Sequence, residues 1–384
     1  MDLDRRSFLV SSFAAMSLPA MGFAAVPEAE QRLVLVLLRG GADGLAMVPA
    51  VGDPDYASAR GGVAVADPIA VDGMFGLHPG LAPVAGWLDS GELALVHAVA
   101  APYSERSHFD AQNVLENGAD GPGARRDGWL GRALPHVGAG TSAVAIGQGL
   151  PLVLRGGPST ASIEPLWQRN ASDALMRELD TLYATDPVLG PALEDALAAE
   201  AFVQQAVGDL RGRGKPGDVA ADAEAAGRLL GHPLGPRVGV MSLDGWDTHA
   251  GQQARFERQV SALAGGLVGL RQGLGAAWRD TVVVCVTEFG RNVAANGTGG
   301  TDHGVGGAAL LAGGSVAGGR VIADWPGLAR DELIEGRDLR PTVDVRAVFK
   351  GILRDHLGVS EGALSDEVFP GSGAVAPMSG LVRG

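Results

Sequence analysis

The chain has 384 residues and a formal net charge of −14 at pH 7, with 44 acidic and 30 basic side chains. This excess of negative charge disfavours nucleic acid and anionic membrane surfaces as partners. The single cysteine, Cys285, excludes an intrachain disulfide, and its place in an apolar run indicates a small buried side chain rather than a reactive thiol.

The N-terminal segment predicts a twin-arginine export signal. The pair Arg5-Arg6 precedes an apolar run, from Phe13 to Ala25, that is too short to anchor the chain in a bilayer. We expect cleavage after Ala24, which makes residues 1–24 the signal. Such signals direct folded proteins across the bacterial inner membrane, so we expect a periplasmic or secreted protein. No later segment is apolar and long enough to serve as a transmembrane anchor of the mature form.

Continuous apolar runs alternate with helical patterns along the rest of the chain. Strands that are buried on both faces and alternate with helices predict an α/β protein in three layers, with a mainly parallel central sheet flanked by helices. The expected strands are residues 33–38, 93–96, 238–241, 281–286 and, as a weaker pattern, 308–311. The expected helices are residues 79–90, 107–117, 252–278 and 343–357.

We expect a single α/β domain over residues 25–370. Within it, residues 172–230 are rich in Ala, Leu, Asp and Glu and poor in β-branched side chains. This stretch is either a helical insertion or cap, or a set of helices that cover one face of the sheet. Residues 371–384 are rich in Gly, Ser and Pro, which predicts an irregular tail.

Carboxylates and imidazoles recur immediately after the predicted strands. In open α/β sheets, ligands bind beyond the carboxyl ends of the strands, so these side chains are expected to share one edge of the sheet. Imidazole together with carboxylate suits Zn²⁺, Mn²⁺ or Fe, whereas a carboxylate-rich subset suits Ca²⁺ or Mg²⁺. The candidate metal ligands are Asp43, Asp247, His249, Glu288, Asp302 and His303.

Three consecutive residues are the candidate catalytic groups: Arg106, Ser107 and His108. Ser107 stands at a predicted helix N-terminus, where the helix dipole favours a bound anion. Arg106 is placed to hold an anionic substrate.

Most of these residues also have a structural interpretation. Asp43 can close an Asx turn, and Ser107 can act only as an N-cap, with His108 a surface residue in the first turn of the helix. Asp247 and His249 can hydrogen-bond a tight loop. Arg106, and with it Arg291, can neutralise neighbouring carboxylates rather than bind substrate.

Several motifs follow one another in a fixed order from the signal to about residue 360: Arg5–Leu9, Leu38–Leu45, Phe75–Pro79, Arg106–Gln112, Gly245–His249, Thr287–Arg291 and Gly300–Gly304. They resemble those of the domain-of-unknown-function 1501 family. The family is grouped with the alkaline-phosphatase/sulfatase-like fold, which implies a mixed, mainly parallel sheet between helices. In that superfamily two metals lie at strand ends, and a Ser, Thr or formylglycine nucleophile begins a helix.

The resemblance implies roles for particular residues. Asp43 matches the acidic ligand after the first strand, Ser107 matches the nucleophile, and Asp247 with His249 matches an Asp and His ligand pair at a shorter spacing. His303 matches the late histidine ligand. Glu288 and Phe289 stand where the superfamily commonly has Asp and His, and no Cys/Ser-x-Pro/Ala-x-Arg sequence surrounds Ser107, which argues against a formylglycine sulfatase.

The sequence therefore predicts an exported, metal-dependent hydrolase of a phosphate, sulfate or related ester, with Zn²⁺, Mn²⁺ or Ca²⁺ as its cofactor. Ser107 would attack the ester or orient a water that does. The alternative is a non-catalytic periplasmic protein that binds an envelope glycan or a secreted partner. Convergence of the candidate ligands around Ser107 favours the enzyme, and their dispersal favours the binding protein.

Overall fold

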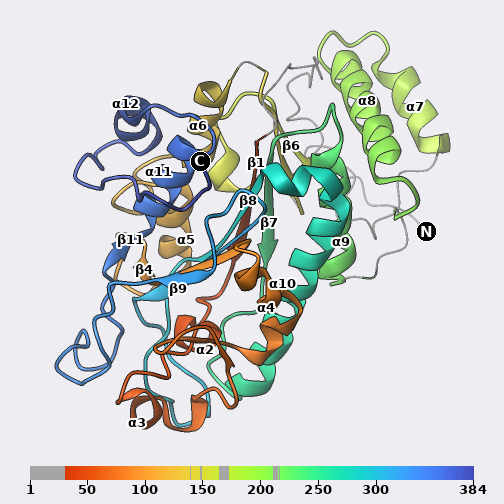
Figure 1. Cartoon of the computed structure of the whole chain (residues 1–384). Coiled ribbons are helices and arrows are strands. Elements are labelled where there is room, and N and C mark those ends of the chain that lie inside the picture. Colours follow the sequence, from red (N-terminus) through yellow and green to blue (C-terminus); the bar gives the residue numbers. More distant parts are fainter. Residues whose placement is uncertain (1–30, 139, 148, 164–172, 211–214, 216) are drawn as a thin grey trace.

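A nine-stranded sheet lies at the centre of the computed structural model, with layers of helices on both of its faces (Figure 1). The structure describes residues 31–138, 140–147, 149–163, 173–210, 215 and 217–384, so the expected export signal lies outside the described residues. The strands follow the order β10-β4-β9-β8-β1-β7-β5-β6, and β11 pairs with β4. Their bounds are β1 Arg32–Leu38, β4 Leu93–Ala100, β5 Ala143–Ile146, β6 Thr160–Ile163, β7 Val238–Leu243, β8 Thr281–Thr287, β9 Gly307–Ala312, β10 Arg320–Ile322 and β11 Val343–Asp344. A separate two-stranded sheet is formed by β2 (Ile69–Ala70) and β3 (Gly76–Leu77).

The strand directions bring several loops to one edge of the sheet. Strand β1 pairs in parallel with both β7 and β8, and only β9 among the nine strands runs antiparallel to its neighbours. The loops that follow β1, β4, β7 and β8 therefore emerge at the same edge as the segment that precedes β9. This arrangement confirms the expected three-layer, mainly parallel α/β fold.

Two hydrophobic cores, one on each face of the sheet, explain the continuous apolar strands. Alternate residues of β1 contribute to the two cores: Val34, Val36 and Leu38 to one, and Leu33, Leu35 and Leu37 to the other. The first core is covered by α4 (Ala82–Asp89), α9 (Val219–Gly231) and α10 (Gln252–Leu274). The second is covered by α5 (His108–Asn117), α6 (Trp129–Val137), α11 (Val345–Asp355) and α12 (Glu361–Ala363).

Residues 172–230, which were expected to be helical, contain helices α7, α8 and α9, and these helices pack differently. Helix α9 packs along α10 and buries one face over the sheet, whereas α7 (Asp173–Tyr183) and α8 (Leu189–Val207) extend away from it (Figure 1). Two short helices, α2 (Gly44–Met47) and α3 (Tyr56–Arg60), lie between β1 and β2. Residues 371–384 contain no helix or strand.

The helices of the described residues include none that is both long and apolar enough to cross a membrane. Cys285 is buried in β8, as expected from its sequence, and burial raises the pKa of its thiol.

Candidate metal centre

Three histidines and one aspartate converge at the carboxyl edge of the sheet. His108 is the first residue of α5, Asp247 and His249 follow β7, and His303 precedes β9. Ligand atoms of His108, Asp247 and His303 all lie within 4.8 Å of one another. The convergence follows from the topology, because β9 is antiparallel and so brings the segment before it to the edge where the parallel strands end.

The Nε2 atoms of all three rings face one oxygen, Oδ1 of Asp247. The distances to this oxygen are 3.0 Å from His249, 3.3 Å from His303 and 3.5 Å from His108. The Nε2 atoms of His249 and His303 are themselves 2.9 Å apart.

The opposite nitrogen of each ring has an acceptor as its partner. Nδ1 of His108 lies 2.8 Å from Oε1 of Glu288, Nδ1 of His249 lies 3.3 Å from Oδ1 of Asp302, and Nδ1 of His303 lies 2.9 Å from the carbonyl oxygen of Arg106. A carboxylate or a carbonyl only accepts, so each Nδ1 must carry the proton of a neutral ring. The three Nε2 lone pairs then face one another and the Asp247 carboxylate.

Such a set of acceptors requires positive charge between its members. Two imidazole lone pairs cannot lie 2.9 Å apart without a shared proton or a shared cation. Nε2 of His108 is buried and has no hydrogen-bond partner among the described residues. Ligating histidines usually donate their other N–H to a carboxylate or carbonyl, which is the pattern of all three rings. The donor set therefore fits a divalent metal ion of the kind that imidazole binds.

Glu288 orients His108 from the interior of the protein. Its side chain is 1% exposed, and Oε1 also accepts hydrogen bonds from the backbone N–H of Gly40 (2.8 Å) and from Nε2 of Gln112 (3.0 Å). Burial alone would raise the pKa of Glu288, but these hydrogen bonds outweigh it and hold that pKa at about 2. The hydrogen bond between Glu288 and His108 also raises the pKa of His108. Burial, by contrast, lowers the pKa of His303.

Sequence reasoning missed Gln112. The signal was its position four residues after His108, which puts both side chains on one face of α5. Oε1 of Gln112 accepts a hydrogen bond from Nη1 of Arg39 (3.1 Å), so the amide is fixed from both sides.

Arg291 holds the loops beneath the cluster together. Its side chain is fully buried and donates to the backbone carbonyls of Gly40, Gly41, Trp246 and Thr301. One N–H also reaches Oδ1 of Asp247 at 2.6 Å. Burial would raise the pKa of Asp247, and the Arg291 guanidinium lowers it below its usual value. These contacts agree with one of the two roles expected for Arg291, the neutralisation of a neighbouring carboxylate.

The structure places Asp43 outside the cluster. Its side chain is 1% exposed and forms an ion pair of 2.6 Å with Arg60, which is also buried. It caps α2 by accepting from the N–H of Ala46, and it accepts a further hydrogen bond from Gln252. We therefore leave Asp43 out of the ligand set.

The side chains of Ser107 and Arg106 make no hydrogen bond to the converging atoms among the described residues. Ser107 is the N-cap residue of α5, but its side chain makes no capping hydrogen bond. It lines a separate pocket together with Glu105, Asp110 and Asp120, and these carboxylates would repel an anionic ester. The Arg106 guanidinium is paired with Asp338 and Glu335, at 2.6 and 2.9 Å.

The backbone of Arg106 does take part in the site. Its φ of 59° is a backbone conformation that residues other than glycine rarely adopt. Its carbonyl oxygen accepts the hydrogen bond from Nδ1 of His303. Asp302, the remaining candidate, is exposed and partners His249 from outside the cluster.

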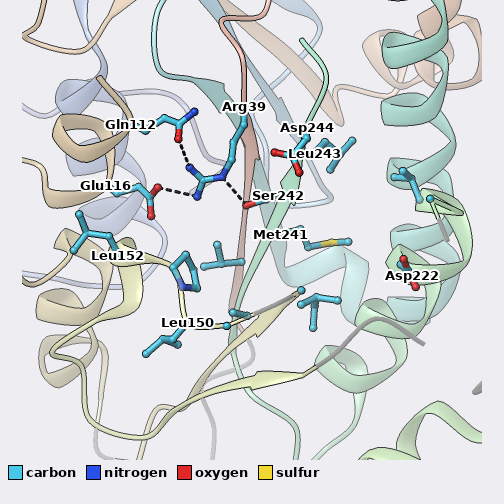
Figure 2. Close-up of a pocket in the computed structure, with 18 of the residues that line it drawn as sticks. Arg39, Gln112, Glu116, Leu150, Leu152, Asp222, Met241, Ser242, Leu243 and Asp244 are labelled. Atoms are coloured by element: carbon cyan, nitrogen blue, oxygen red, sulfur yellow. Dashed lines mark hydrogen bonds and ion pairs between the residues drawn. The ribbon is translucent and has the colours of Figure 1, made fainter. Parts of the chain in front are cut away.

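A cleft of about 1140 Å³ is lined in part by Gln112 (Figure 2), which follows His108 on α5. Its lining also includes Met241, Ser242 and Arg39, and Figure 2 shows the Arg39 guanidinium bonded to Ser242, Gln112 and Glu116. Gln112 is shared, because it lines the cleft and also holds Glu288. Phe109, the neighbour of His108, lines the same cleft and is 88% exposed.

Comparisons with known proteins identify a family for most of the chain. The family described as "Protein of unknown function (DUF1501)" matches residues 97–369, which include His108, Asp247, His249 and His303. No curated protein sequence matches the chain.

Several solved structures are similar to this chain at low identity. A phosphonate monoester hydrolase of Agrobacterium radiobacter is 13% identical with a TM-score of 0.40, and the alignment covers 86% of this chain and 74% of that one. The C-terminal periplasmic domain of EcEptC from Escherichia coli, in complex with zinc, is 12% identical with a TM-score of 0.36 and 77% of each chain covered. The PsFucS1 sulfatase from Pseudoalteromonas sp. is 14% identical with a TM-score of 0.38, and the alignment covers 99% of this chain and 78% of that one.

Proposed function

The chain belongs to the DUF1501 family, and from that premise we propose that it is an exported, metal-dependent hydrolase of phosphate, sulfate or related esters. The observation that carries the proposal is the convergence of three Nε2 atoms on Oδ1 of Asp247, each ring being held by an acceptor at its other nitrogen. His108, Asp247, His249 and His303 would hold the metal. Three imidazoles favour Zn²⁺ or Mn²⁺ over Ca²⁺, which prefers oxygen ligands.

A divalent cation at this position supplies Lewis acidity, which polarises an ester oxygen and makes water a better nucleophile at neutral pH. The side chains of Asp247 and His249 are each 45% exposed, so one side of the cluster is open to substrate. Asp302 is 57% exposed and would accept the Nδ1 proton of His249, so that the Nε2 of this ring is free to bind the metal. The rest of the substrate would occupy the cleft that shares Gln112 with the site.

Water, rather than Ser107, is the nucleophile in this proposal. The pocket around Ser107 contains carboxylates, and no hydrogen bond links its hydroxyl to the histidine cluster in the described part of the chain. Ser107→Ala should therefore keep hydrolytic activity within a few-fold of the wild-type protein. A loss of all hydrolysis in this variant, with metal binding retained, would return the nucleophile's role to Ser107.

The metal requirement is tested by elemental analysis and thermal unfolding of the purified protein. Chelation should lower the melting temperature, and Zn²⁺ or Mn²⁺ should restore it, because a ligand at a hundredfold excess over its Kd stabilises the folded state by about 2.7 kcal/mol. His249→Ala should abolish the response. His136 lies on α6, outside the cluster, and pairs with Glu367, so His136→Ala should retain the response to metal.

Hydrolysis of 4-nitrophenyl phosphate and 4-nitrophenyl sulfate should depend on the same metal. If no stoichiometric metal is found and chelation leaves the melting temperature unchanged, the hydrolase proposal fails. The alternative, a periplasmic protein that binds an envelope glycan or a secreted partner, would then replace it.

A further inference from the structure

A buried polar network connects helix α10 to the two loops that carry most of the proposed ligands. Gln252 is the first residue of α10 and is 2% exposed. Its Oε1 accepts hydrogen bonds from the hydroxyls of Thr248 (3.0 Å) and Thr301 (2.5 Å), and both threonines are fully buried. Thr248 lies between Asp247 and His249, and Thr301 immediately precedes the segment with His303.

The orientation of the Gln252 amide is fixed from the other side by Asp43. Nε2 of Gln252 donates to Oδ2 of Asp43 at 2.5 Å, and the charge of Asp43 is balanced by Arg60. A carboxylate only accepts, so the NH₂ group must face Asp43 and the amide oxygen must face the threonines. Both threonine hydroxyls then donate to the amide oxygen of Gln252, and every donor in the network faces an acceptor.

The same region is joined by backbone contacts. The N–H of Thr301 donates to the carbonyl of Thr248 (3.2 Å), and the N–H of Gln252 donates to the carbonyl of Gly299 (2.9 Å). Helix α10 is packed against the first core over its length, so it provides a rigid support for these loops. Gln252 thus bridges the loop of His249 and the loop of His303 without touching either histidine.

We infer that Gln252 is a positioning residue of the metal centre, which holds the loop of Asp247 and His249 at a fixed distance from the loop of His303. This inference rests on the proposed metal site and extends it to residues beneath the ligands. Metal affinity depends strongly on how ligands are oriented by the groups behind them, and the loss of such a partner typically weakens affinity 10- to 100-fold. It also gives Asp43, which was expected to be a ligand, a role in orienting Gln252.

The experiment measures the Kd for Zn²⁺ of the full chain by competition with a fluorescent chelator, together with the melting temperature of the metal-free protein. Gln252→Met keeps the side-chain volume but removes both kinds of hydrogen bond, and it should weaken Zn²⁺ binding at least tenfold. Thr301→Val should weaken binding in the same direction, and Thr301→Ser, which restores the hydroxyl, should recover the wild-type Kd. These two variants keep the test decisive if Gln252→Met does not fold.

Two controls separate positioning from general stability. Gln253→Met changes the neighbouring residue, whose amide bonds Gly62 at the surface, and should leave the Kd within twofold of wild type. Val348→Ala creates a cavity in the second core, so it should lower the melting temperature of the metal-free protein while leaving the Kd unchanged.

The outcomes distinguish this inference from the proposed function. If wild-type protein binds Zn²⁺ and Gln252→Met and Thr301→Val bind it equally tightly, the positioning role is overturned and the metal centre stands. If wild-type protein binds no Zn²⁺, the metal centre itself is overturned, and the inference falls with it.

Discussion

The same side chain, histidine, has opposite roles at two places on this sheet. His97 in β4 is completely buried, with Nε2 2.9 Å from the carbonyl oxygen of Val48 and Nδ1 accepting from the N–H of Ala98 (2.8 Å). Its ring stacks on Phe75 and meets the edge of Trp325. Every polar atom of His97 has a partner, so no lone pair is left for a metal ion. The cluster histidines differ because their Nε2 atoms face one another.

His97 should make the folded protein sensitive to acid. Burial lowers the pKa of His97 to about 4, below the value near 6.5 of an exposed histidine. Between pH 6.5 and 4 the unfolded chain binds a proton at this residue and the folded chain does not, so the free energy of unfolding falls as the pH falls. The loss approaches roughly 3 kcal/mol at pH 4.

The measurement is the free energy of unfolding in urea between pH 4 and 7.5, for the wild type and His97→Gln. The variant should be less stable at pH 7.5 but should lose less stability on acidification. Parallel curves for the two proteins would mean that His97 titrates normally in the folded state.

At the scale of elements, the loops after β7 and before β9 must approach closely for His249 to meet His303. A glycine permits this approach: a Cβ at Gly300 would collide with the backbone of Thr248 and His249. Gly297, three residues earlier in the same loop, has no atom within 4 Å of the position where its Cβ would lie.

Gly300→Ala should push the two loops apart. Overpacking of this kind costs about 1–3 kcal/mol, and because the backbone itself obstructs the methyl group, the Zn²⁺ affinity should fall as well. Gly297→Ala is the matched control and should alter neither quantity. Unfolding curves and Zn²⁺ titrations of the two variants measure the difference, and equal behaviour would contradict the close packing seen here.

The sequence was sufficient to predict the elements that form the sheet's centre, and it failed where the outcome depended on distant partners. The apolar runs of β1, β7 and β8 identified buried parallel strands, and the polar residues after them predicted the edge of the sheet at which the histidines converge. Strand β6 (TASI) was missed because it has only four residues and no apolar run, and the apolar strand β5 (AVAI) was missed because it is equally short. Short segments of this kind become strands through the neighbours with which they pair.

The sequence did not reveal which of the candidate residues join the histidine cluster and which do not. Asp43 follows a strand just as Asp247 does, but a buried arginine, Arg60, lies beside Asp43 in the fold. Ser107 and His108 are adjacent, and only the direction in which α5 begins determines that the imidazole faces Glu288. Both outcomes depend on contacts between residues in different segments of the chain, and the hydrophobic periodicity of the sequence does not predict such contacts.

At the scale of the whole molecule, the proposed metal centre exists only after the chain has folded. Its members come from loops that follow three different strands and precede a fourth, from His108 to His303. Ligands so far apart in sequence bind a metal ion weakly in an unfolded chain, so metal binding and folding are coupled. A route that exports folded protein would let the cytoplasm load the site before transport.

Replacing Arg5 and Arg6 together by lysine should therefore retain the protein in the cytoplasm in a folded state, because the receptor of this route recognises the paired arginines. Cell fractionation followed by immunoblotting measures the distribution, and protease resistance of the retained protein shows that it has folded. The control is His249→Ala with both arginines intact, which removes a proposed metal ligand but keeps the signal. Its distribution separates recognition of the signal from loading of the metal site. If the double-lysine variant reaches the periplasm as efficiently as wild type, the N-terminal segment acts through a different route. The link between folding, metal loading and export would then have no support, because a chain exported unfolded assembles its site only after transport.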